Sequence, residues 1–157
     1  MSSQPQRELE VAAIAHAADA IIFADARGTM RTWNRAAVAV FGFAEHEAVG
    51  QSLNLIIPEY LRRAHWDGYH RAMDSGQTRL AGRTTTTGAL HKDGHRLYVE
   101  MSFAVVRGPD GAVVGSVGVA RDATRRYEEE KARHQGRSHN ATTESSGGDG
   151  PTSGTGG

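Results

Sequence analysis

The apolar positions in the first third of the chain come in short runs that end at glycine. An alanine-rich stretch at residues 4–18 favours a helix. The apolar run Ala20–Asp25 and residues 29–34 lie on either side of a glycine turn, which is typical of a β-hairpin. Asparagine and glycine then bracket a short helix at residues 35–41, and glycine ends a helical turn at residues 44–49.

Residues 57–76 form the longest periodic stretch of the chain. Pro58 provides a good first turn of a helix, and Gly76 a good stop. Apolar or small side chains recur there at three- and four-residue steps, as on one face of an amphipathic helix: Leu61, Ala64, His65, Gly68, Tyr69, Ala72 and Met73. His65 lies in the middle of this face, where a buried imidazole needs a partner. This histidine is therefore the first candidate functional residue.

The pattern changes to that of strands after the long helix. Threonines make residues 79–90 favour a strand, and apolar and polar side chains alternate along residues 96–106. Residues 112–121 follow as a third strand, with Val113, Val117 and Val119 on one face. A charged helix begins near Asp122. The whole pattern predicts an α+β fold, a five-stranded antiparallel sheet with short helices on one face and helices flanking it at both termini.

Length, charge and composition narrow the class of protein. The 157 residues suffice for one domain and its flanking segments. Lysine plus arginine and aspartate plus glutamate number 18 each, so charge gives no reason to expect nucleic acid or an acidic membrane surface as partner. The chain has no cysteine, which excludes disulfides, thiolate-bound metals and thiol catalysis. No apolar run approaches a membrane span and no signal peptide is evident, so we expect a cytoplasmic protein.

Composition also divides the chain into four expected segments. Residues 1–12 would be a helical extension, 13–124 the folded domain and 125–135 an exit helix. Residues 136–157 are rich in glycine and serine and bury nothing, so we expect a disordered tail there.

Several short motifs resemble those of PAS sensor domains, in the same order. The segment D-A-I-I-F-A-D-A-R-G-T-M-R-T-W-N-R-A-A at residues 19–37 resembles the opening of such a domain. Further matches are F-G-F at 41–43, E-A-V-G-Q-S-L at 47–53, H-K-D-G at 91–94 and G-V-A-R-D-A-T at 118–124. The resemblance implies the PAS fold and a role in sensing. It leaves the ligand open, because members of this family bind haem, flavin, small acids or nothing.

Within that family the chain is most similar to the oxygen-sensing haem domains of nitrogen-fixation sensor kinases. N-L-I-I-P-E-Y-L-R-R-A-H, at residues 54–65, resembles the helix that carries their proximal histidine. The resemblance implies a b-type haem, His65 as the ligand of its iron, and sensing of a diatomic gas such as O2, CO or NO. Aligning instead on residues 67–69 puts Trp66 at the ligand position, but Trp66 points about 100° away around the helix.

The resemblance also implies what surrounds the gas. Met101 and Phe103 fall where the family places apolar residues, and Thr85 stands where it has an arginine. Arg83, two residues earlier on the same predicted strand face, could replace that arginine only if the strand shifts. Arginines here are also candidate donors to the haem propionates. The predicted cofactor-binding residues are His65, Tyr69, Arg79, Arg83, Met101 and Phe103, with His65 as the metal ligand.

Other interpretations remain open at this point. One is a haem-free PAS interaction module whose pocket is empty or holds a small molecule, and whose N-terminal and exit helices mediate homo- or heterodimerisation. Another is a non-covalent flavin with Trp33 and Trp66 as stacking partners. A homodimer is expected for a PAS domain, with a further signalling partner. No nucleophile elbow, phosphate loop or metalloprotease motif occurs, so we do not expect an enzyme. His91 and His95 flank a turn and are expected to be exposed.

Overall fold

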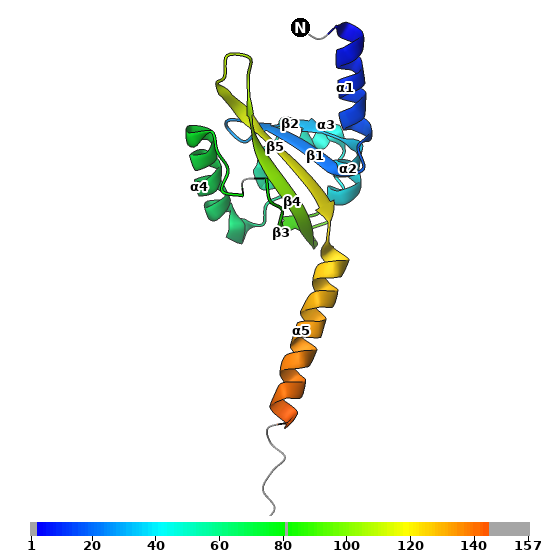
Figure 1. Cartoon of the computed structure of the whole chain (residues 1–157). Helices are drawn as coiled ribbons and strands as arrows, with labels where there is room; N and C mark the ends of the chain where they lie inside the picture. Colours follow the sequence, from blue (N-terminus) through cyan, green and yellow to red (C-terminus); the bar gives the residue numbers. More distant parts are fainter. Residues whose placement is uncertain (1–2, 81, 145–157) are drawn as a thin grey trace, which may run out of the picture. The chain divides into compact units, whose positions relative to one another are not determined.

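A five-stranded antiparallel sheet forms the centre of the structure, a computed structural model that describes residues 3–80 and 82–144. The strands are β1 (Ala20–Asp25), β2 (Met30–Trp33), β3 (Thr85–Leu90), β4 (Arg96–Arg107) and β5 (Val113–Asp122). Their order across the sheet is β2-β1-β5-β4-β3 (Figure 1), so β5 is the central strand, paired with β1 on one side and β4 on the other. The predicted fold class is confirmed.

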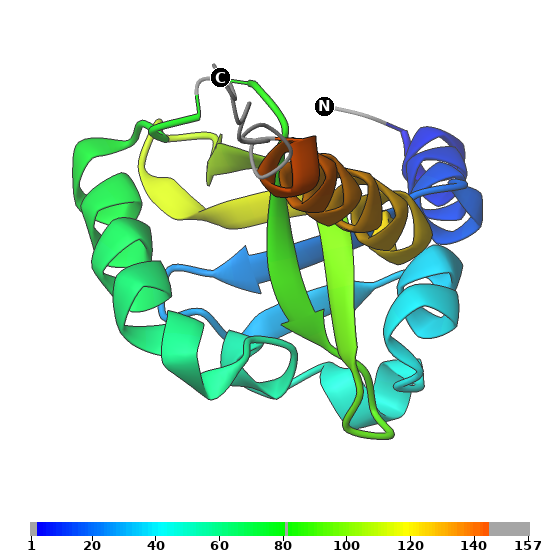
Figure 2. The same ribbon diagram turned by 90° about the horizontal axis from the view of Figure 1, so that it is seen from below.

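Capping residues mark several of the helix ends. They are α1 (Gln4–His16), α2 (Arg35–Phe41), α3 (Glu45–Ala48), α4 (Glu59–Ser75) and α5 (Thr124–Glu144), with a 3₁₀ turn η1 at Leu53–Leu55. Gly42 and Gly76 adopt positive φ angles of 81° and 72° and end α2 and α4, as the sequence predicted. Figure 2 shows α2, α3, η1 and α4 following one another around the sheet.

Asn34 joins the first helix to the sheet. Its Oδ1 accepts hydrogen bonds from the N–H groups of Ala37 (3.1 Å) and Ile21 (2.9 Å), and its Nδ2 donates to the carbonyl oxygens of Ile14 (2.9 Å) and Asp19 (3.0 Å). All the polar atoms of this buried side chain are thereby paired. The residue predicted as a helix cap therefore also fixes where α1 ends and β1 begins.

Two predicted boundaries differ from the structure. β3 begins at Thr85, so the residues from 79 to 84 that were expected in the strand precede it. Strand pairing decides this, because β3 is paired with β4 only from Thr85↔Met101 to Leu90↔Arg96, and threonine propensity alone cannot extend a strand beyond its partner. Helix α5 continues to Glu144, into the segment expected to be a disordered tail from residue 136. The rest of that segment, 145–157, lies outside the described residues.

The chain falls into two units. Residues up to Thr124 form the first unit, with the sheet, its covering helices and α1, and residues from Arg125 onward form the second. The core of the first unit centres on Trp33, Phe41 and Met30, all almost fully buried. Among the described residues, no helix combines the length and apolarity needed to cross a membrane.

Candidate ligand-binding site

A cavity of about 120 Å³ lies between α4 and the sheet. Its walls come from four of the strands, from α2, η1 and α4, and from the link between η1 and α4: Ile22, Ala24, Phe41, Leu53, Ile56, Ile57, Leu61, His65, Thr87, Gly88, Ala89, Val99, Met101, Phe103, Ser116, Gly118 and Ala120. Most of these side chains are apolar. His65, Thr87 and Ser116 bring polar atoms to the lining, so a ligand here would be held mainly by apolar contact.

The small side chains of the central strand leave room for this cavity. Ser116, Gly118 and Ala120 line it, two residues apart along β5. Because side chains alternate across a strand, Val117 and Val119 lie on the opposite face of the sheet. The sequence correctly grouped the valines on one face. The cavity, however, is built from the other face, where the side chains are smallest.

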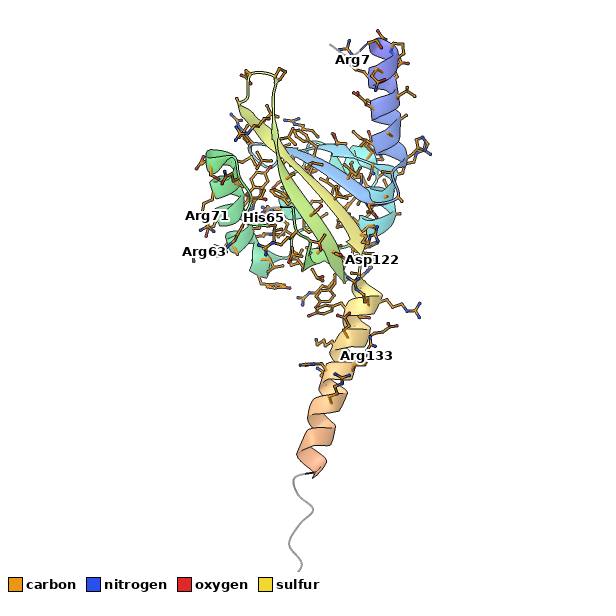
Figure 3. The ribbon with its side chains drawn as sticks, in the orientation of Figure 1. Arg7, Arg63, His65, Arg71, Asp122 and Arg133 are labelled. Carbon is orange, nitrogen blue, oxygen red and sulfur yellow. The ribbon has the colours of Figure 1, made fainter. Side chains whose placement is uncertain are left out.

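His65 projects from the middle of α4 toward the sheet. Figure 3 shows it on the inner side of the helix, while Arg63 and Arg71 point away from the sheet. Its Nδ1 atom is buried and makes no hydrogen bond to any of the residues that the structure describes. Burial lowers the pKa of His65 to about 4, and the nearby His70 adds to this by charge repulsion. The imidazole is therefore neutral at pH 7, the form that can donate a lone pair to a metal.

Tyr69 fixes the orientation of this imidazole. Its ring stacks on the ring of His65 with centroids 5.7 Å apart, and its edge contacts Phe103 at 5.9 Å. The Tyr69 hydroxyl group donates to the carbonyl oxygen of Asp25 (2.7 Å) and lies 3.1 Å from Ser116 Oγ. Tyr69 is buried but does not line the cavity, so it supports the site from behind.

The other predicted site residues divide into two groups. Met101 and Phe103 on β4 line the cavity together with His65. Arg79 and Arg83 are exposed, precede β3 and are not part of the lining. Arg83 therefore does not share a strand face with Thr85, contrary to the expectation from the sequence. A role for either arginine in binding a ligand stays a prediction.

The two tryptophans considered as flavin partners lie elsewhere. Trp33 is buried, and its ring N–H donates to the carbonyl oxygen of Phe43 (3.0 Å). Trp66 donates to Asn54 Oδ1 (2.8 Å), and its ring lies against Gly28 in the β1–β2 turn, where a Cβ atom would be only 2.1 Å from it. Neither tryptophan lines the cavity. Trp66 thus holds α4 to the hairpin, as its position about 100° from His65 around the helix allows.

Sequence reasoning missed several lining residues. Leu61 was placed on the inner face of α4 but not named as a site residue, although it precedes His65 by one helical turn. Thr87 shares a strand face with Thr85, so the period of two could have singled it out. Ser116 gave no such indication, because a serine in a run of valines and glycines is recognised as cavity-facing only once the strand register is known.

Comparison with known proteins identifies the fold family. Residues 9–123 match the family model of the PAS fold. The chain belongs to the PAS family. This PAS domain is 28% identical over 130 residues to sensor protein FixL of Bradyrhizobium diazoefficiens, an alignment that covers 82% of this chain and 25% of that protein. It is also 31% identical over 85 residues to an uncharacterized protein of Azorhizobium caulinodans, covering 54% of this chain and 12% of the relative. The PAS domain thus spans a quarter or less of these curated relatives.

Solved structures support the same conclusion. The PAS domain of a protein from Colwellia psychrerythraea superposes with a TM-score of 0.66 at 25% identity, covering 76% of this chain and 98% of that one. An RNA-binding light-oxygen-voltage receptor superposes with a TM-score of 0.69 at 22% identity, covering 92% of this chain and 40% of the receptor. At 22% identity the likeness concerns the fold alone. The resemblance to PAS sensors inferred from the sequence motifs is confirmed.

Proposed function

We propose that this PAS domain binds a b-type haem through His65 and senses a diatomic gas. The observation that carries the proposal is the half-buried, neutral imidazole of His65, which lines an apolar cavity and whose buried Nδ1 has no hydrogen-bond partner among the described residues. A buried polar atom without a partner costs free energy of folding, and coordination of a cofactor would give this imidazole a partner. When bound, the haem iron supplies the position at which a gas molecule binds.

The remaining residues of the site have separate tasks in this proposal. Tyr69 holds the His65 ring in one orientation through stacking. Met101 and Phe103 provide an apolar wall that keeps water from the gas-binding side. The choice of haem rests on the resemblance of residues 54–65 to the haem domains of sensor kinases, and sensor protein FixL is one of the relatives that this chain matches.

The end of β5 offers a route for the signal. The Tyr98 N–H on β4 donates to Thr124 Oγ1 (3.0 Å), and the Ala123 N–H donates to the Tyr98 carbonyl oxygen (2.8 Å). Met101 lies three residues beyond Tyr98 on the same strand, so a shift of the cavity wall would be transmitted to Thr124, where α5 begins. In this proposal α5 then passes the signal to a partner.

A second candidate is a haem-free PAS module that holds a small organic molecule or nothing. The size of the cavity favours it, because about 120 Å³ is comparable to the engineered apolar cavity of about 150 Å³ that takes up benzene. A porphyrin is larger, so haem binding requires α4 and the sheet to move apart.

Absorption spectra decide between these candidates. Purified protein is titrated with haem beside His65→Ala and beside His70→Ala, which removes an exposed histidine from the same helix. We expect a sharp Soret band in the parent and in His70→Ala, and its loss or displacement in His65→Ala. A Soret band unchanged in His65→Ala would overturn His65 as ligand, and its absence from the parent would favour the haem-free module. Flavin bands in the protein as purified would favour a non-covalent flavin instead.

We further propose that the PAS domain forms a homodimer in which α1 takes part. Leu9, Val11 and Ile14 on α1 are 66%, 68% and 40% exposed, so this helix presents apolar side chains that a second copy of the domain could cover. In Leu9→Glu/Val11→Glu, light scattering after gel filtration should report a monomer where the parent is a dimer. An unchanged dimer would exclude α1 from the interface.

A further inference from the structure

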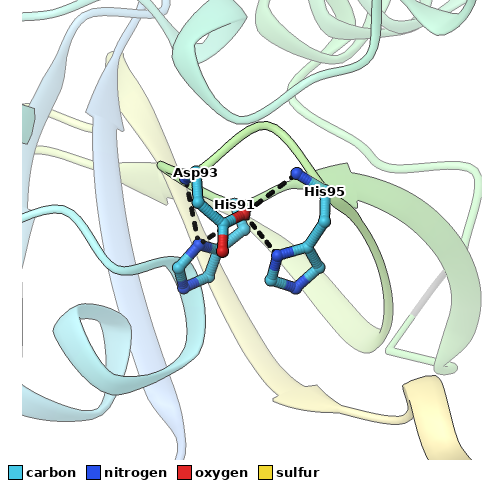
Figure 4. A group of neighbouring side chains, drawn as sticks. All are labelled: His91, Asp93 and His95. Atoms are coloured by element: carbon cyan, nitrogen blue, oxygen red, sulfur yellow. Dashed lines mark hydrogen bonds and ion pairs between the residues drawn. The ribbon is translucent and has the colours of Figure 1, made fainter.

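Two histidines and an aspartate converge at the turn between β3 and β4 and are not part of the cavity lining. Figure 4 shows the rings of His91 and His95 on the same side of the turn with the Asp93 carboxylate between them. The two rings are stacked with centroids 4.5 Å apart and planes 21° from parallel. His91 Nδ1 lies 3.1 Å from Asp93 Oδ1, and His95 Nδ1 contacts the same oxygen. Three potential donor atoms, one from each residue, lie within 4.8 Å of one another.

The backbone of the turn produces this convergence. The His91 N–H donates to the His95 carbonyl oxygen (3.0 Å), and the Gly94 N–H donates to the His91 carbonyl oxygen (2.9 Å). These bonds make His91 and His95 opposite members of the hairpin, so their side chains emerge on one face. Gly94 permits the tight reversal with a φ angle of 92°. Spacing along the sequence alone did not reveal that the two rings meet.

The first of these rings is held in place before any ligand arrives. The His91 side chain is only 23% exposed, and its ring occupies the space beside Gly42 where a Cβ atom would be 2.5 Å from it. The Lys92 N–H donates to the carbonyl oxygen of Phe41 (2.9 Å), and Lys92 Nζ bonds both carboxylate oxygens of Glu47 (2.6 and 2.9 Å). The charge of Lys92, between His91 and Asp93 in the sequence, is thereby paired with Glu47.

The donor set and its openness suit a transition-metal ion. Two imidazole nitrogens and one carboxylate oxygen are ligands typical of Zn²⁺ and its neighbours, whereas Mg²⁺ and Ca²⁺ prefer oxygen. In a tetrahedral zinc site neighbouring ligand atoms are about 3.3 Å apart, close to the 3.1 Å between His91 Nδ1 and Asp93 Oδ1. Asp93 and His95 are 61% and 52% exposed, which leaves room for a water ligand. The Asp93 N–H donates to His91 Nδ1 (3.2 Å), a contact that a coordinate bond would replace.

We propose that His91, Asp93 and His95 form a binding site for one divalent transition-metal ion of the Zn²⁺ class. The ion would link the two ends of the hairpin turn. Because the Lys92 main chain is bonded to Phe41, which lines the cavity, the ion would also stiffen that wall. The site is independent of His65 and does not require the haem proposal to hold.

Calorimetric titration of tag-free, haem-free protein with ZnCl₂ tests the proposal. We expect one Zn²⁺ per chain and no binding of Mg²⁺. Affinity should fall at least about tenfold in His95→Ala and in Asp93→Asn. It should be unchanged in His46→Ala, which removes an exposed histidine of α3, and in His65→Ala. Both turn variants affect exposed side chains, so each should unfold at the parent's temperature when a chelator is present.

The opposite results would overturn the proposal. Zinc affinity that survives in both turn variants would place the ion elsewhere, and loss in His65→Ala alone would place it in the cavity. The absence of a single-site isotherm in the parent would show that His91, Asp93 and His95 only hydrogen-bond to one another and do not bind the ion. As an independent readout, Zn²⁺ should shift the imidazole NMR signals of His91 and His95 and leave those of His46 in place.

Discussion

The imidazole of His65 and the phenol ring of Tyr69 are stacked one helical turn apart on α4, with centroids 5.7 Å apart and planes 28° from parallel. The far end of Tyr69 is fixed to the sheet, since its hydroxyl group bonds the carbonyl oxygen of Asp25. The orientation of the His65 ring therefore depends on hydrogen bonds that Tyr69 makes to the sheet.

Removing the hydroxyl group of Tyr69 should weaken the fold. Tyr69→Phe leaves the buried Ser116 Oγ and the Asp25 carbonyl oxygen without this partner, so we expect the free energy of unfolding to fall by about 1–2 kcal/mol. Urea denaturation measures it. Tyr60→Phe is the matched control, because Tyr60 is 61% exposed and should lose almost nothing. Equal stability of both variants would show that the buried hydroxyl group contributes no net stability.

The stability of the haem-free protein should depend on pH through His65. Its pKa falls to about 4 in the folded state, mainly because burial disfavours the charged ring, against about 6.5 in the unfolded chain. Above pH 6.5 the His65 ring is neutral in both the folded and the unfolded state, so it does not make the free energy of unfolding depend on pH. Between about pH 6.5 and pH 4 only the unfolded state gains the proton, so the free energy of unfolding falls by up to about 3 kcal/mol, and below pH 4 the loss levels off.

Denaturation of the parent beside His65→Gln between about pH 7 and pH 4 checks this expectation. Glutamine does not titrate, so the variant should lose less stability than the parent over that range. Identical pH profiles would mean that His65 titrates normally and is not desolvated.

A larger side chain in the cavity should weaken ligand binding without weakening the fold. At Gly118 an added Cβ atom would lie 3.7 Å from Met101 Cε and 4.0 Å from the Ile22 carbonyl oxygen, which is ordinary contact. In Gly118→Val we therefore expect the free energy of unfolding to stay within about 1 kcal/mol of the parent's. Haem affinity should drop at least about tenfold, the equivalent of 1.4 kcal/mol. Haem titration measures this, and Ala104→Val, at an exposed position on β4, should leave affinity unchanged. Undiminished affinity in Gly118→Val would place the ligand outside the cavity.

Asn34 should be one of the most sensitive polar residues of the chain. Asn34→Ala removes four hydrogen bonds, and we expect the free energy of unfolding to fall by about 2–3 kcal/mol. Asn34→Asp keeps the acceptor that caps α2 but places a buried carboxylate oxygen against the carbonyl oxygens of Ile14 and Asp19, so it should be at least as destabilising as the alanine variant. Thermal unfolding ranks the variants, and an aspartate variant as stable as the parent would show that the two bonds donated by Nδ2 contribute nothing.

The fold was predictable because its boundaries depend on local chemistry. Asn34 caps α2, and Gly42 and Gly76 end α2 and α4 with positive φ angles, all through interactions within a few residues. Pro58 directly precedes α4, and its fixed φ angle suits the start of a helix. The start of β3 was not predictable in this way. The stretch 79–90 as a whole is rich in threonine, but only pairing with β4 decides where the strand begins.

The candidate site was predictable only in part, for a related reason. The helical period placed His65 inward, and the strand period placed Met101 and Phe103 on one face. Which face of β5 lines the cavity depends on registers with β1 and β4, and these involve residues far apart in the sequence. The meeting of His91 and His95 likewise depends on the conformation of the turn between them.

Three of the small cavity-lining residues, Ser116, Gly118 and Ala120, lie on the strand that is paired on both sides. A mutation at any of them changes the volume of the chamber while the ladder of main-chain hydrogen bonds stays intact. Single substitutions at these positions should therefore change which ligand fits, because side chains determine the selectivity of the cavity whereas main-chain hydrogen bonds determine the fold.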